Sequence, residues 1–175
     1  MEYFIVCQNE SYQNTVYFKI KSANPIQRRI EVTKEDVKDV KGTLRFYVRS
    51  QEDVFYPDIL DIPIFLVSDK LAKVFKYFFQ TEDFRSVLLS DAKNKQNHLY
   101  WLPILEKIEC LHESSEFSPK GLERNLVLDR EKIGGRKIFR IDRTFGKTVV
   151  VNLEIAESIL RRNSVGVSLK QIDIA

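Results

Sequence analysis

Residues 64–79, IFLVSDKLAKVFKYFF, decide the fold class because they pass from a short apolar run into a capped helix. Ser68 follows the apolar run, and its hydroxyl can accept a hydrogen bond from the first turn of a helix. Apolar side chains then recur at helical spacing, at Leu71, Val74, Phe75 and Phe78. The stretch therefore predicts a strand followed by a helix over residues 69–79.

A second stretch, VVVNLEIAESILRR at residues 149–162, has the same organisation. Asn152 can cap a helix, and Gly166 comes after the end of that helix. The apolar stripe of the helix consists of Ile155, Ala156, Ile159 and Leu160. We predict this second helix over residues 153–162. The likeness of the two stretches is one of architecture, since any strand that runs into a capped helix shows it.

Short runs of β-branched and aromatic residues, separated by polar turns, occupy much of the remaining chain. They lie at residues 3–7, 15–20, 43–48, 86–90, 99–111, 126–128 and 137–141. Pro103 marks an edge or a bend, and Gly134 and Gly135 allow a tight turn between the last two runs. Because the connections have hairpin length, we predict an α+β fold, mostly antiparallel sheet with two principal helices.

The connection at residues 53–63 is the best internal boundary, because it holds two prolines and several acidic residues. It also contains apolar side chains that require burial, at Ile59, Leu60 and Ile62. A chain of 175 residues, 43% of them hydrophobic, has the length and composition of one ordinary domain. We therefore predict a single domain, residues 1–175, with two lobes and a lobe boundary near residues 53–63.

The overall charge favours no particular class of partner. The 28 Lys and Arg residues nearly cancel 25 Asp and Glu, and the net charge of +3 is too small to require a nucleic acid or a membrane. The first apolar run is too short for a secretory signal, and no apolar stretch approaches the ~18 residues of a membrane helix. Cys7 and Cys110 do not make a disulfide framework. We expect a cytoplasmic protein with reduced thiols and no membrane partner.

Residue types that support catalysis or metal binding are few. The soft metal ligands are His98, Cys110 and His112, and no standard spacing supplies a complete ligand set. The sequence contains no nucleophile elbow, and the glycine that a phosphate-binding loop needs is missing before Gly146. We therefore expect a protein that is not an enzyme and that binds no metal, nucleotide or organic cofactor.

The segment at residues 120–147 suggests an alternative function, because nine Lys and Arg residues there face only four Asp and Glu. Interleaved aromatic side chains could stack on the bases of a single-stranded nucleic acid. The candidate contacts for this alternative are Arg136, Lys137, Phe139 and Arg140. A solvated sheet face with flexible lysines explains the same pattern, and we prefer it because no RNA-binding signature accompanies the charge.

The second half of the chain carries an ordered series of short signatures. They are Leu66-Val67-Ser68 with Leu71, Tyr100, Ile108-Glu109-Cys110-Leu111 with Glu113 and Ser115, Ile138-Phe139-Arg140, and Val150-Val151-Asn152 with Gly166-Val167. Over residues 64–175 this series resembles a bacterial domain of unknown function that is grouped with the immunity proteins of polymorphic toxin systems. The resemblance implies a cytoplasmic protein that binds a cognate toxin and blocks it. It transfers no defined functional residues.

Charge and exposure make the acidic connection the candidate contact for such a partner. Its prolines predict a stiff, exposed ridge, and aromatic side chains inside a charged rim are typical of protein interfaces. The candidate contact residues are Glu52, Asp53, Phe55, Tyr56, Asp58 and Asp61. The alternative is that Phe55 and Tyr56 simply pack beneath a surface loop.

Overall fold

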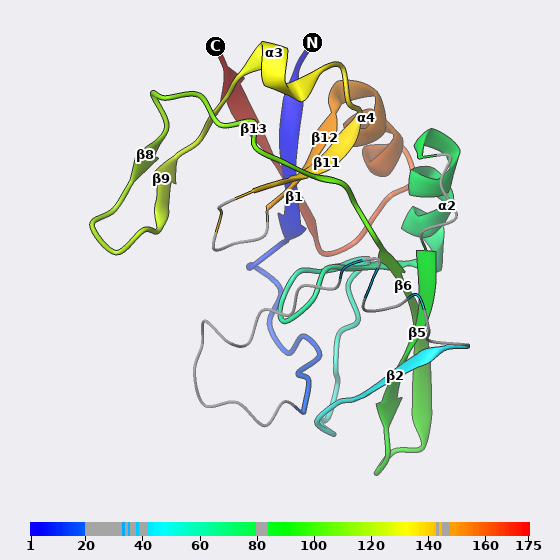
Figure 1. Cartoon of the computed structure of the whole chain (residues 1–175). Coiled ribbons are helices and arrows are strands. Elements are labelled where there is room, and N and C mark those ends of the chain that lie inside the picture. The colour runs from blue at the N-terminus through cyan, green and yellow to red at the C-terminus, as the bar shows by residue number, and fades with distance from the viewer. Residues whose placement is uncertain are drawn as a thin grey trace. The chain divides into compact units, whose positions relative to one another are not determined.

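The computed structural model describes residues 1–19, 33, 35, 38, 42–79, 84–142, 144 and 148–175. Two units can be distinguished along the chain (Figure 1). Unit 1 consists of Met1–Cys7, Leu105–Asn163 and Ser168–Ala175, and unit 2 consists of Gln8–Ile104 and Ser164–Val167. Residues 53–63 belong to unit 2, and the predicted single domain with two lobes stays a prediction.

Unit 1 contains a six-stranded sheet with the strand order β10-β13-β1-β12-β11-β7. The strands are β1 (Tyr3–Gln8), β7 (Lys107–Ile108), β10 (Val127–Leu128), β11 (Ile138–Ile141), β12 (Val149–Asn152) and β13 (Val167–Ile174). Strand β12 pairs antiparallel with both β1 and β11, whereas β7 and β10 pair parallel with their neighbours. A separate ribbon, β8 (Glu116–Phe117) with β9 (Glu123–Asn125), projects from this unit (Figure 1).

The core of unit 1 is formed by side chains of this sheet and of the short helix α3 (Arg130–Ile133), and a second helix, α4 (Leu153–Leu160), follows β12. Asn152 caps α4, since its side-chain oxygen accepts a hydrogen bond of 3.1 Å from the Ile155 N–H. The ring of Tyr3 packs edge-on against Phe139 at 5.8 Å between centroids, and its hydroxyl donates to the Arg136 carbonyl. The Asn152 cap therefore fixes the end of β12, and the contact of Tyr3 with Phe139 fixes the start of β1.

Unit 2 contains a five-stranded sheet with the order β2-β5-β6-β4-β3. The strands are β2 (Leu44–Tyr47), β3 (Ile59–Leu60), β4 (Leu66–Ser68), β5 (Phe84–Asp91) and β6 (Gln96–Pro103). Strands β5 and β6 form the long green hairpin of Figure 1, in register from Phe84 opposite Pro103 to Asp91 opposite Gln96. This hairpin places the side chains of its turn beside residues that follow β2 in the sequence.

Helix α2 (Asp69–Phe78) packs on this sheet as its apolar spacing requires. The Ser68 hydroxyl accepts a hydrogen bond from the Leu71 N–H, and the buried face comprises Leu71, Ala72, Val74 and Phe75. The Lys76 ammonium lies 3.6 Å from the centre of the Trp101 ring, and the indole N–H donates to Asp69. The helix is therefore held by its cap, its apolar face and the indole of β6.

The structure confirms the predicted fold class: the described residues form mostly antiparallel sheet, with principal helices at 69–78 and 153–160. The extended run at 99–111 was predicted with an interruption at Pro103, and the structure confirms the interruption: β6 ends at Pro103, which has no N–H for a sheet, and β7 begins at Lys107. Gly134 and Gly135 have the predicted positive φ angles, but the two runs that they separate do not pair as a hairpin. Asp129 caps the short helix α3, and β10 pairs with β13. Residue 20 of the run at 15–20 lies outside the described residues.

Gly166 occupies a position that only glycine fits, which leads to a stability prediction. Its φ is +71°, and a Cβ there would lie 2.4 Å from the Cβ of Pro57 and 3.1 Å from the ring of Phe55. Gly135 has nearly the same φ, +74°, with no atom within 4 Å of an added Cβ. A left-handed residue with a side chain costs roughly 1–2 kcal/mol, and forced overpacking adds about 1–3 kcal/mol.

We expect Gly166→Ala to lower the free energy of unfolding by the sum of both costs, and Gly135→Ala by the backbone cost alone. Urea denaturation followed by circular dichroism measures both variants. Equal losses in the two would show that residues 55–57 do not pack against Gly166 as described.

Candidate partner-binding site

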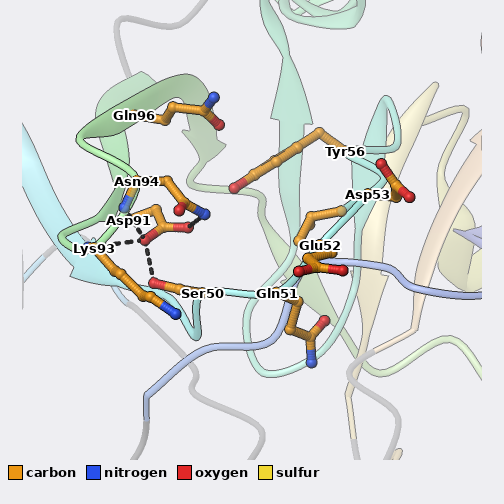
Figure 2. A pocket seen from close by; sticks show the side chains of 10 residues that line it. Ser50, Gln51, Glu52, Asp53, Tyr56, Asp91, Lys93, Asn94 and Gln96 are labelled. Atoms are coloured by element: carbon orange, nitrogen blue, oxygen red, sulfur yellow. Dashed lines mark hydrogen bonds between the residues drawn. The ribbon is translucent and has the colours of Figure 1, made fainter.

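A pocket of about 560 Å³ opens in unit 2 between the segment at residues 50–56 and the turn of the β5–β6 hairpin (Figure 2). Ten residues line it: Ser50, Gln51, Glu52, Asp53, Val54, Tyr56, Asp91, Lys93, Asn94 and Gln96. Its volume is within the range of ligand-binding clefts. Most of the lining side chains are polar, so the pocket is suited to a polar or charged occupant.

The Asp91 carboxylate joins the two sides of the pocket, although its residue is only 3% exposed. The Ser50 hydroxyl donates to it, as do the N–H groups of Lys93 and Asn94 at 3.1 Å and the Asn94 side-chain amide at 2.9 Å (Figure 2). The Ser50 bond, followed by the Asn94 and Lys93 bonds, holds the pKa of Asp91 below its usual value, although burial opposes them. Asp91 is therefore ionised at neutral pH.

Tyr56 forms an aromatic wall of the pocket. Its ring stacks on the imidazole of His98, with 3.5 Å between centroids and 17° between planes. Burial raises the pKa of Tyr56, and the nearby Asp91 charge adds to the effect, so the phenol stays protonated. For His98, burial lowers the pKa because it disfavours the charged imidazolium, which keeps the imidazole neutral near pH 7. The stack fixes the Tyr56 ring in place beside the pocket.

The rim of the pocket is acidic. Glu52 and Asp53 are exposed, and among the described residues that line the cavity they and Asp91 supply three carboxylates against one ammonium group, that of Lys93. Asp53 has a φ of +52°, a left-handed conformation that Asp and Asn tolerate better than most residues. The pocket is thus locally negative in a chain whose net charge is +3.

The six predicted contact residues do not form one ridge. Glu52, Asp53 and Tyr56 line the pocket. Phe55 is half-buried and stacks on Tyr12, with 4.6 Å between ring centroids. Asp61 is half-buried and accepts a hydrogen bond of 3.1 Å from the Gln8 N–H.

Asp58 is buried, and its carboxylate accepts three hydrogen bonds, two from the start of α2 and one from the segment at 164–167. The Ser68 hydroxyl donates at 2.6 Å, the Val165 N–H at 2.7 Å and the Lys70 ammonium at 2.9 Å. Burial by itself would raise the pKa of Asp58, but the bonds from Ser68, Val165 and Lys70 outweigh it and lower the pKa. This carboxylate has a structural role within unit 2, and its side chain is not available as a charged rim.

Sequence reasoning did not single out several residues that shape this surface, among them Tyr12, Ser50, Asp91 and Asn94. The spacing of Asp91 and Asn94 is a local turn signal, since an aspartate often accepts hydrogen bonds from the backbone two and three residues later. The contacts of Ser50 with Asp91 and of Tyr12 with Phe55 join segments about 40 residues apart, and no local sequence pattern predicts them.

The alternative nucleic-acid contacts are not arranged as one exposed basic and aromatic surface. Phe139 and Arg140 are buried. The Arg136 guanidinium makes two hydrogen bonds to Glu106, at 2.8 and 3.0 Å, and the Lys137 ammonium lies 2.9 Å from Glu154. Residues 143 and 145–147 of the basic segment lie outside the described residues. These positions give the nucleic-acid alternative no support.

Within the part of the chain that the structure describes, no three His, Cys, Asp or Glu side chains are grouped so that they could hold a metal ion. Cys110 is fully buried, and burial raises the pKa of its thiol to about 11. No described helix has the length and apolar character needed to cross a membrane.

The immunity protein family Imm11 matches residues 4–173, nearly the whole chain. The chain belongs to this family. The Imm11 match confirms the resemblance to immunity proteins and extends it over the first third of the sequence, including the segment at residues 50–56 beside the pocket. No curated protein matches the chain.

Asp58 provides a test of the framework that holds the pocket of this Imm11 chain in place. We expect Asp58→Asn to lower the free energy of unfolding at pH 7 by about 1–3 kcal/mol, because charge-assisted hydrogen bonds are lost. The folded-state pKa of Asp58 is depressed below 3.8, so its contribution is complete above that pH and is lost as the pH falls through the folded pKa. The difference between wild type and variant should therefore shrink below about pH 4.

Urea titrations at pH 7, 5 and 3 measure this difference, and Asp53→Asn is the matched control because Asp53 is exposed in the same connection. A difference that stays constant down to pH 3, or a control as destabilised as Asp58→Asn, would contradict the structural role of the Asp58 carboxylate.

Proposed function

We propose that this chain is a bacterial, cytoplasmic immunity protein that binds a cognate toxin and neutralises it without catalysis. The observation that carries the proposal is the family match over residues 4–173. Neutralisation by binding requires a stable, complementary surface and no reactive group. The pocket in unit 2 is consistent with this role, because it combines charge, an aromatic wall and a rigid support.

The contact surface that we propose is centred on Glu52, Asp53 and Tyr56. Their segment is anchored from behind, since the Tyr100 hydroxyl donates to the Pro57 carbonyl at 2.7 Å and the Phe55 N–H donates to the Asn14 carbonyl at 2.8 Å. Beside it, Tyr12 is 41% exposed and rests on Phe55. Aromatic anchors within a charged rim supply most of the binding energy in many interfaces.

The charge of this surface favours a basic partner. Carboxylates outnumber ammonium groups among the described pocket-lining residues, and electrostatic complementarity accelerates the encounter of oppositely charged proteins. Toxins that attack nucleic acids need basic surfaces to approach phosphates. The immunity protein would then block such a toxin by occupying the basic surface that its substrate requires.

Co-expression tests the neutralisation itself. The toxin to use is the one encoded beside this gene, because a toxin and its immunity protein must be inherited together. Cells that produce the toxin should survive when they also produce this chain, and the two proteins should copurify. Cell death at equal toxin levels, despite a folded and soluble chain, would refute the proposed function.

Charge changes at the rim test the proposed contact surface. We expect Glu52→Lys with Asp53→Asn to slow association with the toxin about tenfold at low salt, because rim charges act mainly on encounter. Asn retains the left-handed backbone at position 53. Stopped-flow or biosensor kinetics measure the association rate, and the thermal midpoint should change little because both side chains are exposed.

The matched control is Glu113→Lys with Glu116→Gln, which makes the same change in net charge at two exposed positions of unit 1. Equal slowing in both double variants would show that only net charge matters. No slowing in either would place the contact surface elsewhere.

A further inference from the structure

We infer that the pocket between residues 50–56 and the β5–β6 turn is a receptor for an arginine side chain of the partner protein. The inference rests on the proposed function and adds the chemistry of the group that the pocket receives. It follows from the juxtaposition of a buried carboxylate, two exposed carboxylates and a fixed aromatic wall around one cavity.

The bonding of Asp91 is the first argument for a cationic occupant. Its four hydrogen-bond donors are a hydroxyl, two backbone N–H groups and a side-chain amide, all of them neutral. Among the described residues, no Lys or Arg side chain forms an ion pair with this carboxylate. A buried charge that has neutral donors alone is stabilised further when a cation approaches it.

The acceptor capacity of Asp91 is the second argument. Its Oδ1 atom accepts three of the hydrogen bonds, whereas its Oδ2 atom accepts one, from the Asn94 amide. A carboxylate oxygen has two lone pairs, so Oδ2 keeps an acceptor site. Glu52 and Asp53 add exposed carboxylates at the rim of the same pocket.

The aromatic wall selects a guanidinium over an ammonium group. Tyr56 extends from the segment at residues 50–56 toward the Asp91 turn (Figure 2). Tyr56 lines the pocket while its ring is held against His98, so a planar group in the pocket can contact a fixed aromatic side chain. A guanidinium is planar, is weakly hydrated and donates five hydrogen bonds in a fork that matches carboxylates, whereas an ammonium is a compact, strongly hydrated charge.

Matched small probes test this inference on the full-length chain. The probes are Nα-acetyl-arginine methylamide, its lysine counterpart and its citrulline counterpart, which has nearly the shape of arginine without the charge. We expect the arginine probe to bind with a dissociation constant in the millimolar range. It should shift the backbone amide NMR signals of residues 50–56 and 91–96, and the citrulline probe should bind at least about tenfold more weakly.

Two pocket variants and a control complete the experiment. Glu52→Gln and Tyr56→Leu should each weaken binding of the arginine probe about tenfold, the effect of one charge-assisted or stacking contact. Glu116→Gln removes an exposed carboxylate from the β8–β9 ribbon and should leave binding unchanged. Amide spectra of each variant establish that it is folded before the titration.

The inference is overturned if arginine and citrulline bind equally, if the shifted signals lie outside the pocket, or if no probe binds in the millimolar range. Its failure is distinguishable from failure of the proposed function. If the chain protects cells from the toxin but does not bind the arginine probe, the proposed function stands and this inference is refuted. If the chain binds the arginine probe but does not protect cells, the arginine receptor stands and the proposed function is refuted.

Discussion

The buried carboxylate of Asp58 holds together the parts of unit 2 on which the candidate site depends. Its carboxylate accepts hydrogen bonds from the hydroxyl of Ser68, which caps α2, from the ammonium of Lys70 in the first turn of that helix, and from the N–H of Val165. Its backbone N–H donates to the Val165 carbonyl, and its backbone carbonyl accepts from the Ser68 N–H. One residue thus joins the connection at 53–63, the start of a helix and the segment at 164–167, so a change there affects all three.

The pocket is built on this fixed connection. Two residues before Asp58, the ring of Tyr56 is clamped by His98, and Pro57 is held by the Tyr100 hydroxyl and by close packing on Gly166. On the opposite side, the tight hairpin turn of β5–β6 presents Asp91. A binding group that sits on a rigid support loses little conformational entropy on binding, which favours tight complexes.

The distribution of charge matters more for this protein than its net charge. The basic segment that suggested nucleic-acid binding has several of its cations engaged in ion pairs, with Lys132 on Asp129, Arg136 on Glu106 and Lys137 on Glu154. By contrast, the acidic side chains that line the pocket outnumber the basic ones in the part of the chain that the structure describes. A chain with a small positive net charge therefore presents a negative patch where a partner is proposed to bind.

The sequence by itself determined the elements whose causes are local. The caps Ser68 and Asn152 and the apolar spacing after them fixed both principal helices, because a helix forms from contacts three and four residues apart. The alternation of short strands and turns fixed the α+β class. The short family signatures also indicated the immunity function, and the match over nearly the whole chain confirmed the family.

Only the tertiary structure decided which side chains form the site. Local patterns placed Asp58 and Glu52 on the same exposed ridge, yet one is buried against Ser68 and the other lines a pocket. Ser50 meets Asp91, and Tyr12 meets Phe55, across some 40 intervening residues. Such pairs form because the pairing of β2 with β5 and the packing of loops on the sheet bring distant segments together. The sequence around a loop residue does not indicate which distant segment will pack against that residue.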